Sequence, residues 1–299
     1  MKRILIVCAL IMVTAFAMTS CDDQLNSGPC TVRWAGIRIS SYGMRSSFGK
    51  DNFPDETTMA GFAQKMAGCY EGSNGAYILI VGTMSGDDTC QLAFPVTGKN
   101  DYIRGADDDR YESYLDKCDE LGIDVWLQVE PGYADLEKLA EIVMNRYKHH
   151  SSVKGFGIDV EWHKPIEGTD EGTKLSDADA KKVLNKVRSI NPEYTVFVKH
   201  WMQRQLPTKM EGLIYVNDSQ QFEDMNHVIN EFTEWASYYA PQPVMFQIGY
   251  NADKPIWNAY TNPAKEFGQA IVDRCNSGND VGIIWVDFTL SQVINKTNL

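Results

Sequence analysis

The sequence predicts an α/β fold: a single-domain (β/α)8 barrel with a degenerate fifth βα unit. Eight short runs rich in β-branched and aromatic residues alternate with segments of helical periodicity along the chain. Almost every such run also ends in a polar residue. A barrel gathers the carboxyl ends of its strands around one rim, where barrel enzymes keep their sites, so we prefer it to an open doubly wound sheet.

The eight predicted strands are short, and each is flanked by Gly, Pro, Asn or Asp, which commonly bound strands. Their near-continuous apolar character suits parallel strands buried on both faces. In chain order they occupy residues 34–43, 76–84, 124–132, 155–162, 194–201, 212–220, 243–250 and 281–289.

The segments between the strands carry apolar residues at helical spacing. Ser176 followed by Asp179 predicts a helix N-cap with an acidic third position, and Pro263 suits a first helical turn. The link 203–211 is too short for a normal helix, which makes the fifth unit degenerate. The apolar faces consist of Leu136, Leu139, Val143 and Tyr147; Val183, Leu184, Val187 and Ile190; Met225, Val228, Ile229, Phe232, Trp235 and Ala236; and Phe267, Ala270 and Ile271.

The N-terminus has the features of an export signal. Lys2 and Arg3 precede an apolar stretch over 4–18, which is too short to span a bilayer comfortably as a helix. The following Met18-Thr19-Ser20-Cys21 resembles the bacterial lipobox, although ordinary cleavage after Ala17 is the alternative. We therefore expect an extracytoplasmic protein, lipid-anchored to a bacterial membrane. Its expected parts are a signal peptide over 1–20, the lipidated Cys21 with a tether over 21–31, and the barrel over 32–299.

The chain is acidic, with a formal net charge of -12 and a pI near 4.9. Nucleic-acid binding needs clustered positive charge, and the sequence has no Lys/Arg run or basic stripe, so we exclude that class of function. A (β/α)8 barrel is self-contained, and a monomer is the default expectation.

Five cysteines follow Cys21, so at least one thiol stays free within a single molecule. Cys69 and Cys118 end two successive predicted helices, and this pair is our first expectation for a disulfide. No CxxC pair indicates structural zinc, and no GxGxxG or GxxxxGK[ST] motif indicates a nucleotide. We expect neither a cofactor nor a metal.

The strongest local signal is GFGIDVEW, at the end of the fourth predicted strand. Strand side chains alternate between faces, so Asp159 and Glu161 point the same way. Two carboxylates that face a barrel mouth repel each other, and one pKa rises, which lets that group act as a general acid near neutral pH. A structural ion-pair network with Lys199 or Arg38 is the alternative.

The stretch 154–161 resembles glycoside hydrolase family 18, the chitinase and endo-β-N-acetylglucosaminidase family. That family carries DxxDxDxE on its fourth barrel strand. Asp159 and Glu161 match its last two acidic positions, whereas Lys154 and Gly157 replace the first two. The aromatic-Asp element of the family's sixth strand corresponds to Tyr215, Asn217 and Asp218 with altered spacing, and the Trp that floors its sugar site corresponds to Trp285.

The resemblance implies a retaining mechanism in which the substrate's own 2-acetamido group attacks the anomeric carbon. Glu161 would protonate the glycosidic oxygen and then activate water. Asp159 would orient the acetamido group, and Asn217 or Asp218 would help to hold it. The implied substrate is a glycan that contains N-acetylglucosamine.

Three alternatives remain open. The chain also resembles glycoside hydrolase family 25, the muramidases, which have a DxE late in a barrel strand. A non-catalytic glycan-binding barrel is favoured by Lys154 and Gly157 at the expected Asp positions. A hydrolase with its own nucleophile would pair Glu161 with Glu130, Asp218 or Asp287.

Further polar and aromatic residues near strand ends are candidates for substrate binding: Glu130, Trp162, Lys199, Gln247 and Asp287. Of the aromatic residues Trp162, Trp201, Tyr250, Trp257 and Trp285, we expect Trp162 and Trp285 to stack on sugar. Two minor readings concern other chemistry. Lys199 could form a Schiff base, but we expect it to pair with rim carboxylates. His163 and His200 could join those carboxylates around a metal.

Overall fold

The computed structural model describes residues 28–49, 53–98, 100–169 and 171–297. The predicted signal peptide over 1–20 and the predicted lipidation site at Cys21 lie outside these ranges. Among the helices described, none is both long enough and apolar enough to cross a bilayer.

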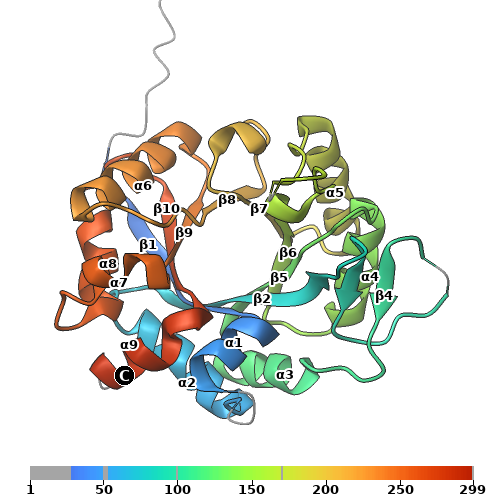
Figure 1. Ribbon diagram of the computed structural model, residues 1–299, viewed down its shortest axis with the longest axis horizontal. Helices are drawn as coiled ribbons and strands as arrows, with labels where there is room; N and C mark the ends of the chain where they lie inside the picture. The colour runs from blue at the N-terminus through green and yellow to red at the C-terminus, as the bar shows by residue number, and fades with distance from the viewer. Residues whose placement is uncertain (1–27, 50–52, 99, 170, 298–299) are drawn as a thin grey trace, which may run out of the picture.

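Eight parallel strands close into a barrel, which confirms the predicted fold class (Figure 1). Closure is direct, because the first strand pairs with the second on one side and with the last on the other. The barrel strands are β1 (Thr31–Ile39), β2 (Asn74–Met84), β5 (Asp124–Val129), β6 (Val153–Asp159), β7 (Thr195–Lys199), β8 (Leu213–Asn217), β9 (Val244–Ile248) and β10 (Asp280–Trp285).

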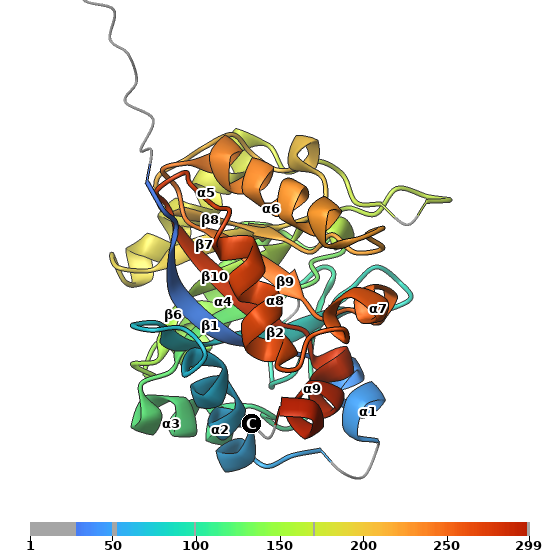
Figure 2. The ribbon, with the colours of Figure 1, turned by 90° about the vertical axis from the view of Figure 1, so that its left-hand side faces the viewer.

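Helices surround the ring of strands, as Figures 1 and 2 show. Ser176 caps α5 by accepting from the Asp179 amide, and Pro263 opens α8, as predicted. Only a short 3-10 turn at Gln203–Gln205 joins β7 to β8, so the fifth unit is degenerate. The helices are α1 (Ser41–Phe48), α2 (Glu56–Ala67), α3 (Glu112–Leu121), α4 (Leu136–Tyr147), α5 (Asp177–Ile190), α6 (Met225–Tyr239), α7 (Lys254–Trp257), α8 (Pro263–Val272) and α9 (Leu290–Thr297).

A short excursion between β2 and α3 was not predicted from the sequence. Strand β3 (Cys90–Leu92) pairs antiparallel with the end of β2, and β4 (Ile103–Gly105) pairs with β3. Each has only three residues, too few to show a period of two. The excursion extends the sheet beyond the barrel beside the carboxyl end of β2 (Figure 1).

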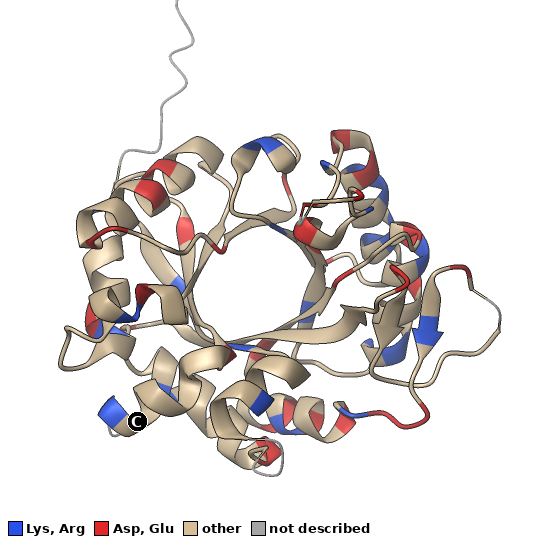
Figure 3. Ribbon diagram, in the orientation of Figure 1, with Lys and Arg blue, Asp and Glu red and all other residues tan. Residues whose placement is uncertain are grey.

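The barrel interior has an apolar lower part and a polar upper part. Inward-facing side chains such as Trp34, Trp126 and Phe197 form a cluster of their own, separate from the larger core between strands and helices. Most strands then bring a polar residue inward at the carboxyl end, such as Arg38 on β1, Gln128 on β5 and Lys199 on β7, because inward positions recur every second residue. Figure 3 shows acidic and basic segments around this ring. The barrel thus places a charged layer on an apolar floor.

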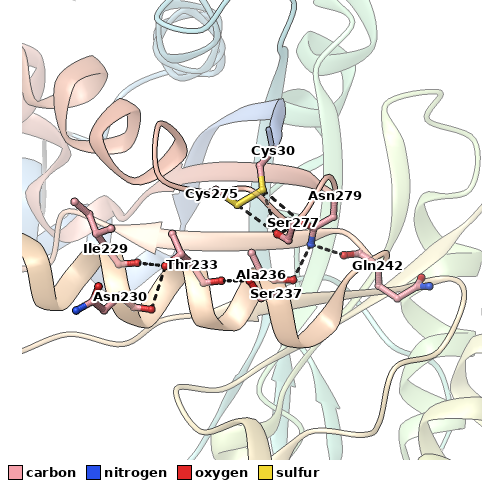
Figure 4. The surroundings of a disulfide bond; sticks show 10 residues. All are labelled: Cys30, Ile229, Asn230, Thr233, Ala236, Ser237, Gln242, Cys275, Ser277 and Asn279. Carbon is pink, nitrogen blue, oxygen red and sulfur yellow. Dashed lines mark hydrogen bonds between the residues drawn. A yellow bond between two sulfur atoms is a disulfide. The ribbon is translucent and has the colours of Figure 1, made fainter. Parts of the chain in front are cut away.

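The disulfide expected between Cys69 and Cys118 is wrong, because both cysteines are free. Cys30, just before β1, is bonded instead to Cys275, just after α8 (Figure 4). The Cys30 amide also donates to the Cys275 carbonyl at 3.0 Å. The bond therefore ties the start of the barrel to the segment that leads into its last strand.

Candidate active site

The ammonium group of Lys199 joins three carboxylates at the carboxyl ends of neighbouring strands. Its Nζ lies 2.5 Å from Oε1 of Glu161, 2.5 Å from Oδ2 of Asp218 and 3.1 Å from Oδ2 of Asp159. Lys199 is only 3% exposed. Gln128 on β5 also donates to Oδ2 of Asp159 at 2.9 Å. The pairing expected for Lys199 is confirmed, and Asp159 and Glu161 do point the same way.

A second buried cation holds the opposite side of the ring. Arg38 on β1 pairs with Oδ1 of Asp287 at 2.5 Å. The backbone amide and hydroxyl of Ser40 donate to Oδ2 of the same carboxylate at 2.5 and 2.6 Å. Asp287 is fully buried, and the backbone of Gly43 packs against it. Both of its oxygens are therefore occupied, so its predicted contact with substrate is wrong and it instead positions Arg38.

Glu130 and Gln247 also face the barrel interior, where tyrosines hold them. Oε1 of Glu130 accepts from the hydroxyl of Tyr42, and Oε2 accepts from the Met84 amide, both at 2.9 Å. Oε1 of Gln247 accepts from the hydroxyl of Tyr250 at 3.0 Å. These contacts place the two residues beside the Lys199 cluster, with Glu130 nearly buried and Gln247 fully buried.

Burial and mutual repulsion separate the pKa values of these carboxyl groups. Burial raises the pKa of Asp159 to about 7, even though Lys199 opposes the shift. Burial and the negative charge of Asp218 raise the pKa of Glu161 well above its usual range. Burial would also raise the pKa of Asp218, but Lys199 and hydrogen bonds outweigh it and leave this pKa lowered. The pKa values of Glu161 and Asp218 are thus shifted in opposite directions.

The charged groups border a cavity of about 400 Å³. Glu161 and Asp218 line it, whereas Lys199 and Asp159 are buried and do not. The other lining residues are Trp201, Ser219, Gln220 and Gln221. Lys199 and Trp201 are two residues apart, so the alternation that paired Asp159 with Glu161 could have singled out Trp201. The partly exposed Trp162 does not line this cavity.

Tyr215 and Asn217 do not reach the site, contrary to the sequence prediction. Both point outward from β8, because Ile214 and Val216 take its inward positions. Tyr215 stacks on Tyr239 of α6 with ring centroids 3.7 Å apart. Asn217 donates to Glu231 of α6 and accepts from the Ser219 amide. These residues dock α6 and shape the loop after β8.

Trp285 is also misplaced by the sequence prediction. Ile284 faces the barrel, so Trp285 points outward and is 1% exposed. Its indole donates to Thr289 at 2.9 Å and meets the edge of Trp257. A side chain enclosed in this way cannot floor a sugar site.

The two histidines considered as metal ligands contact nearby backbone groups instead. Nδ1 of His163 lies 3.0 Å from the Thr173 carbonyl. Nδ1 of His200 accepts from the Met202 amide, and burial lowers the pKa of His200 to about 4. Lys199 is unsuited to a Schiff base, because its carboxylate partners outweigh burial and raise its pKa well above its usual value.

Comparisons with known proteins support the fold of this chain but assign it to no family. No family model and no curated protein matches the chain. Among solved structures, the wild-type protein ZgEngAGH5_4 is 12% identical over 88% of each chain, with a TM-score of 0.50. The xylanase and α-amylase inhibitor XAIP-II from Scadoxus multiflorus is 14% identical over 88% of this chain and 97% of that one, with a TM-score of 0.48.

The β-glucuronidase of Parabacteroides merdae is 12% identical, covering 86% of this chain and 31% of that enzyme, with a TM-score of 0.46. This chain thus spans about a third of that enzyme's length. At 12% identity, the likeness to ZgEngAGH5_4 shows the fold alone, a (β/α)8 barrel.

Replacing Lys199 should destabilise the barrel in a pH-dependent way. Lys199→Met leaves three carboxyl groups, two of them buried, without their cation, which should cost about 3–5 kcal/mol of unfolding free energy at neutral pH. This loss of unfolding free energy should shrink as the pH falls toward 4, because protonation of the carboxyl groups removes their uncompensated charge. Urea denaturation at several pH values measures it.

Lys182→Met, at an exposed lysine on α5, is the matched control and should change the stability by less than about 0.5 kcal/mol. Equal stability of the Lys199→Met and wild-type proteins at neutral pH would show that the cluster does not depend on this cation.

Proposed function

We propose that this protein is a glycoside hydrolase whose general acid is Glu161. One observation carries the proposal: Glu161 and Asp218 flank the same ammonium at a cavity, and their pKa values are shifted in opposite directions. A protonated and an ionised carboxyl group side by side are what acid-assisted cleavage of a glycosidic bond needs.

The spacing of the two carboxyl groups favours a retaining reaction. Because Oε1 of Glu161 and Oδ2 of Asp218 each lie 2.5 Å from Nζ of Lys199, these oxygens are at most about 5 Å apart. Retaining glycosidases hold their carboxyl groups about 5–5.5 Å apart, whereas inverting enzymes need room for a water molecule between them. Asp218 is therefore the candidate for attack on the anomeric carbon.

The reaction would run in two steps. Glu161 donates its proton to the glycosidic oxygen as the bond from that oxygen to the anomeric carbon breaks. Asp218 forms a bond to the anomeric carbon. Glu161, now ionised, takes a proton from water, and the resulting hydroxide displaces Asp218 to give the free sugar.

The family 18 resemblance supports a different partner, the substrate's acetamido group oriented by Asp159. Asp159 lies near enough to share Lys199, and its Oδ1 has no hydrogen-bond partner among the described residues. It does not line the cavity, whereas Asp218 does. This geometry favours Asp218 for contact with substrate and Asp159 for positioning Lys199.

The proposed substrate is a glycan that contains N-acetylglucosamine. Both families that the DxE resembles cut beside N-acetylated amino sugars. Trp201 gives the cavity an aromatic surface for a pyranose ring, and Gln220 and Gln221 offer amide groups to its hydroxyl and acetamido groups.

A non-catalytic glycan-binding barrel is the second candidate. Phe197 fills the barrel beneath the site, and a Cβ at Gly157 would lie 2.1 Å from its ring. The family's additional Asp therefore has no room at position 157. Lys199 also holds the oxygen of Glu161 on which an acid would depend.

We further propose that the protein is exported and lipid-anchored through Cys21. The charged start, the apolar stretch and the lipobox-like segment support this proposal. A barrel displayed outside the cytoplasm would meet extracellular or cell-wall glycans as a monomer.

Replacing the proposed acid should abolish turnover and spare binding. Glu161→Gln should lower kcat/KM by about 10²–10⁴-fold, because the amide cannot donate the proton. The wild-type rate should fall as the pH rises through the raised pKa of Glu161, since the acid form is lost. Hydrolysis of a chromogenic chitobioside and of purified peptidoglycan measures both.

The exposed Glu234→Gln on α6 is the control and should keep the wild-type rate. Full activity of the Glu161→Gln protein would refute the assignment of the acid. A wild-type protein that binds these glycans without turnover would support the second candidate instead.

Two further variants separate the proposed nucleophiles. Asp218→Asn should abolish turnover if Asp218 attacks the anomeric carbon, and added azide should then restore some rate by forming the glycosyl azide. Asp159→Asn should reduce the rate less. If Asp159→Asn is the more damaging and azide rescues neither variant, the acetamido mechanism holds. The rates and the glycosyl azide product are measured on the chitobioside.

Cys21→Ser should release the protein from membranes, because serine cannot carry the thioether-linked lipid. Fractionation of cells that express the full chain, followed by immunoblotting, measures the membrane-bound share. Cys69→Ser is the matched control, since Cys69 is a free cysteine in the barrel, and it should stay with the membrane. Equal membrane retention of the Cys21→Ser protein would reject the anchor.

A further inference from the structure

Two histidines and a glutamate converge outside the barrel. Glu112 opens α3, and His149 and His150 follow α4. Nε2 of His149 lies 2.7 Å from Oε1 of Glu112, and Nε2 of His150 lies 3.5 Å from the same oxygen. One ligand atom from each of the three residues falls within 4.8 Å of the others.

The imidazole of His150 is buried and aimed into this cluster. His150 is 2% exposed. Its Nδ1 lies 2.8 Å from Oδ2 of Asp119, whose other oxygen accepts from the Ser152 amide. Its Nε2 has no hydrogen-bond partner among the described residues. A carboxylate that fixes one ring nitrogen while the other stays free is the arrangement found around metal-binding histidines.

The spacing fits a tetrahedral ion. Ligand bonds of roughly 2.0–2.1 Å place neighbouring ligand atoms about 3.3 Å apart, which lies between the two separations to Glu112, 2.7 and 3.5 Å. Arg146 approaches only Oε2 of Glu112, at 3.3 Å, and its charge is shared with Asp109. Oε1 therefore remains available to an ion.

We propose that Glu112, His149 and His150 bind a divalent transition-metal ion of the zinc type, with water completing its coordination. Two imidazoles with one carboxylate select such an ion over magnesium or calcium, which prefer oxygen ligands. His149 is exposed, so the ion has a path from solvent. The ion would clamp the start of α3 to the link between α4 and β6.

A second set, Asp116 and Asp119 with Nδ1 of His150, is less suitable. Oδ1 of Asp116 lies 3.9 Å from that nitrogen. Asp119 is already occupied by Nδ1 and by Ser152. This set predicts a dependence on Asp116 that the proposed site does not have.

Isothermal titration of the EDTA-treated full chain with zinc chloride tests the proposal. We expect one ion per chain, no heat with magnesium chloride, and a rise in Tm with zinc because the ion binds only the folded state. His149→Ala should weaken zinc binding at least about tenfold and cancel the rise in Tm. Asp119→Asn should weaken binding by about 10–100-fold through the orientation of His150.

Asp116→Asn and His227→Ala, both at exposed positions, are the matched controls and should bind zinc as the wild type does. His149 is itself exposed, so its replacement should leave the fold intact. No binding at up to about 0.1 mM zinc would overturn the proposal. So would binding that survives His149→Ala, or binding that is lost in Asp116→Asn.

Discussion

The buried ammonium of Lys199 is the interaction on which the rest of the barrel mouth depends. It is the shared partner of carboxyl groups that arrive from β6 and β8. An unpaired charge at this depth would cost several kcal/mol, so the groups can coexist only if their protons are distributed to balance the cations. Burial raises the pKa values of Glu130, Asp159 and Glu161, whereas Lys199 lowers the pKa of Asp218. Asp287 is paired with the second cation, Arg38.

The apolar floor makes these shifts possible. Phe197 lies on the same face of β7 as Lys199, two residues earlier, and Gly157 leaves space for its ring. Aromatic side chains below the polar layer keep water out, so burial is the largest influence on each carboxyl group. The glycine that weakens the likeness to family 18 is thus the residue that allows this floor to pack.

The sequence could predict the fold, the strand ends and the pairing of Lys199, because these follow from apolar patterning and from the cost of a buried charge. It could not tell which residues of the later strands point into the barrel. In β8 and β10 both faces are apolar, so alternation alone does not tell whether Ile284 or Trp285 faces the barrel. The Cys30–Cys275 bond could not be predicted for another reason: its partners are 245 residues apart and meet only when the barrel closes.

The proposed role of Glu161 as an acid is compatible with its contact to Lys199, because Lys199 has two other carboxylate partners. Burial raises the pKa of Asp159 to about 7, so this group is largely ionised above that pH. Ionised Asp159 and Asp218 then satisfy the ammonium, and Glu161 can keep its proton for the cavity. Asp159 in this view regulates the acid without touching the substrate. In the proposed mechanism, the DxE pattern supplies a buried carboxyl group that helps to keep a second one protonated at the cavity.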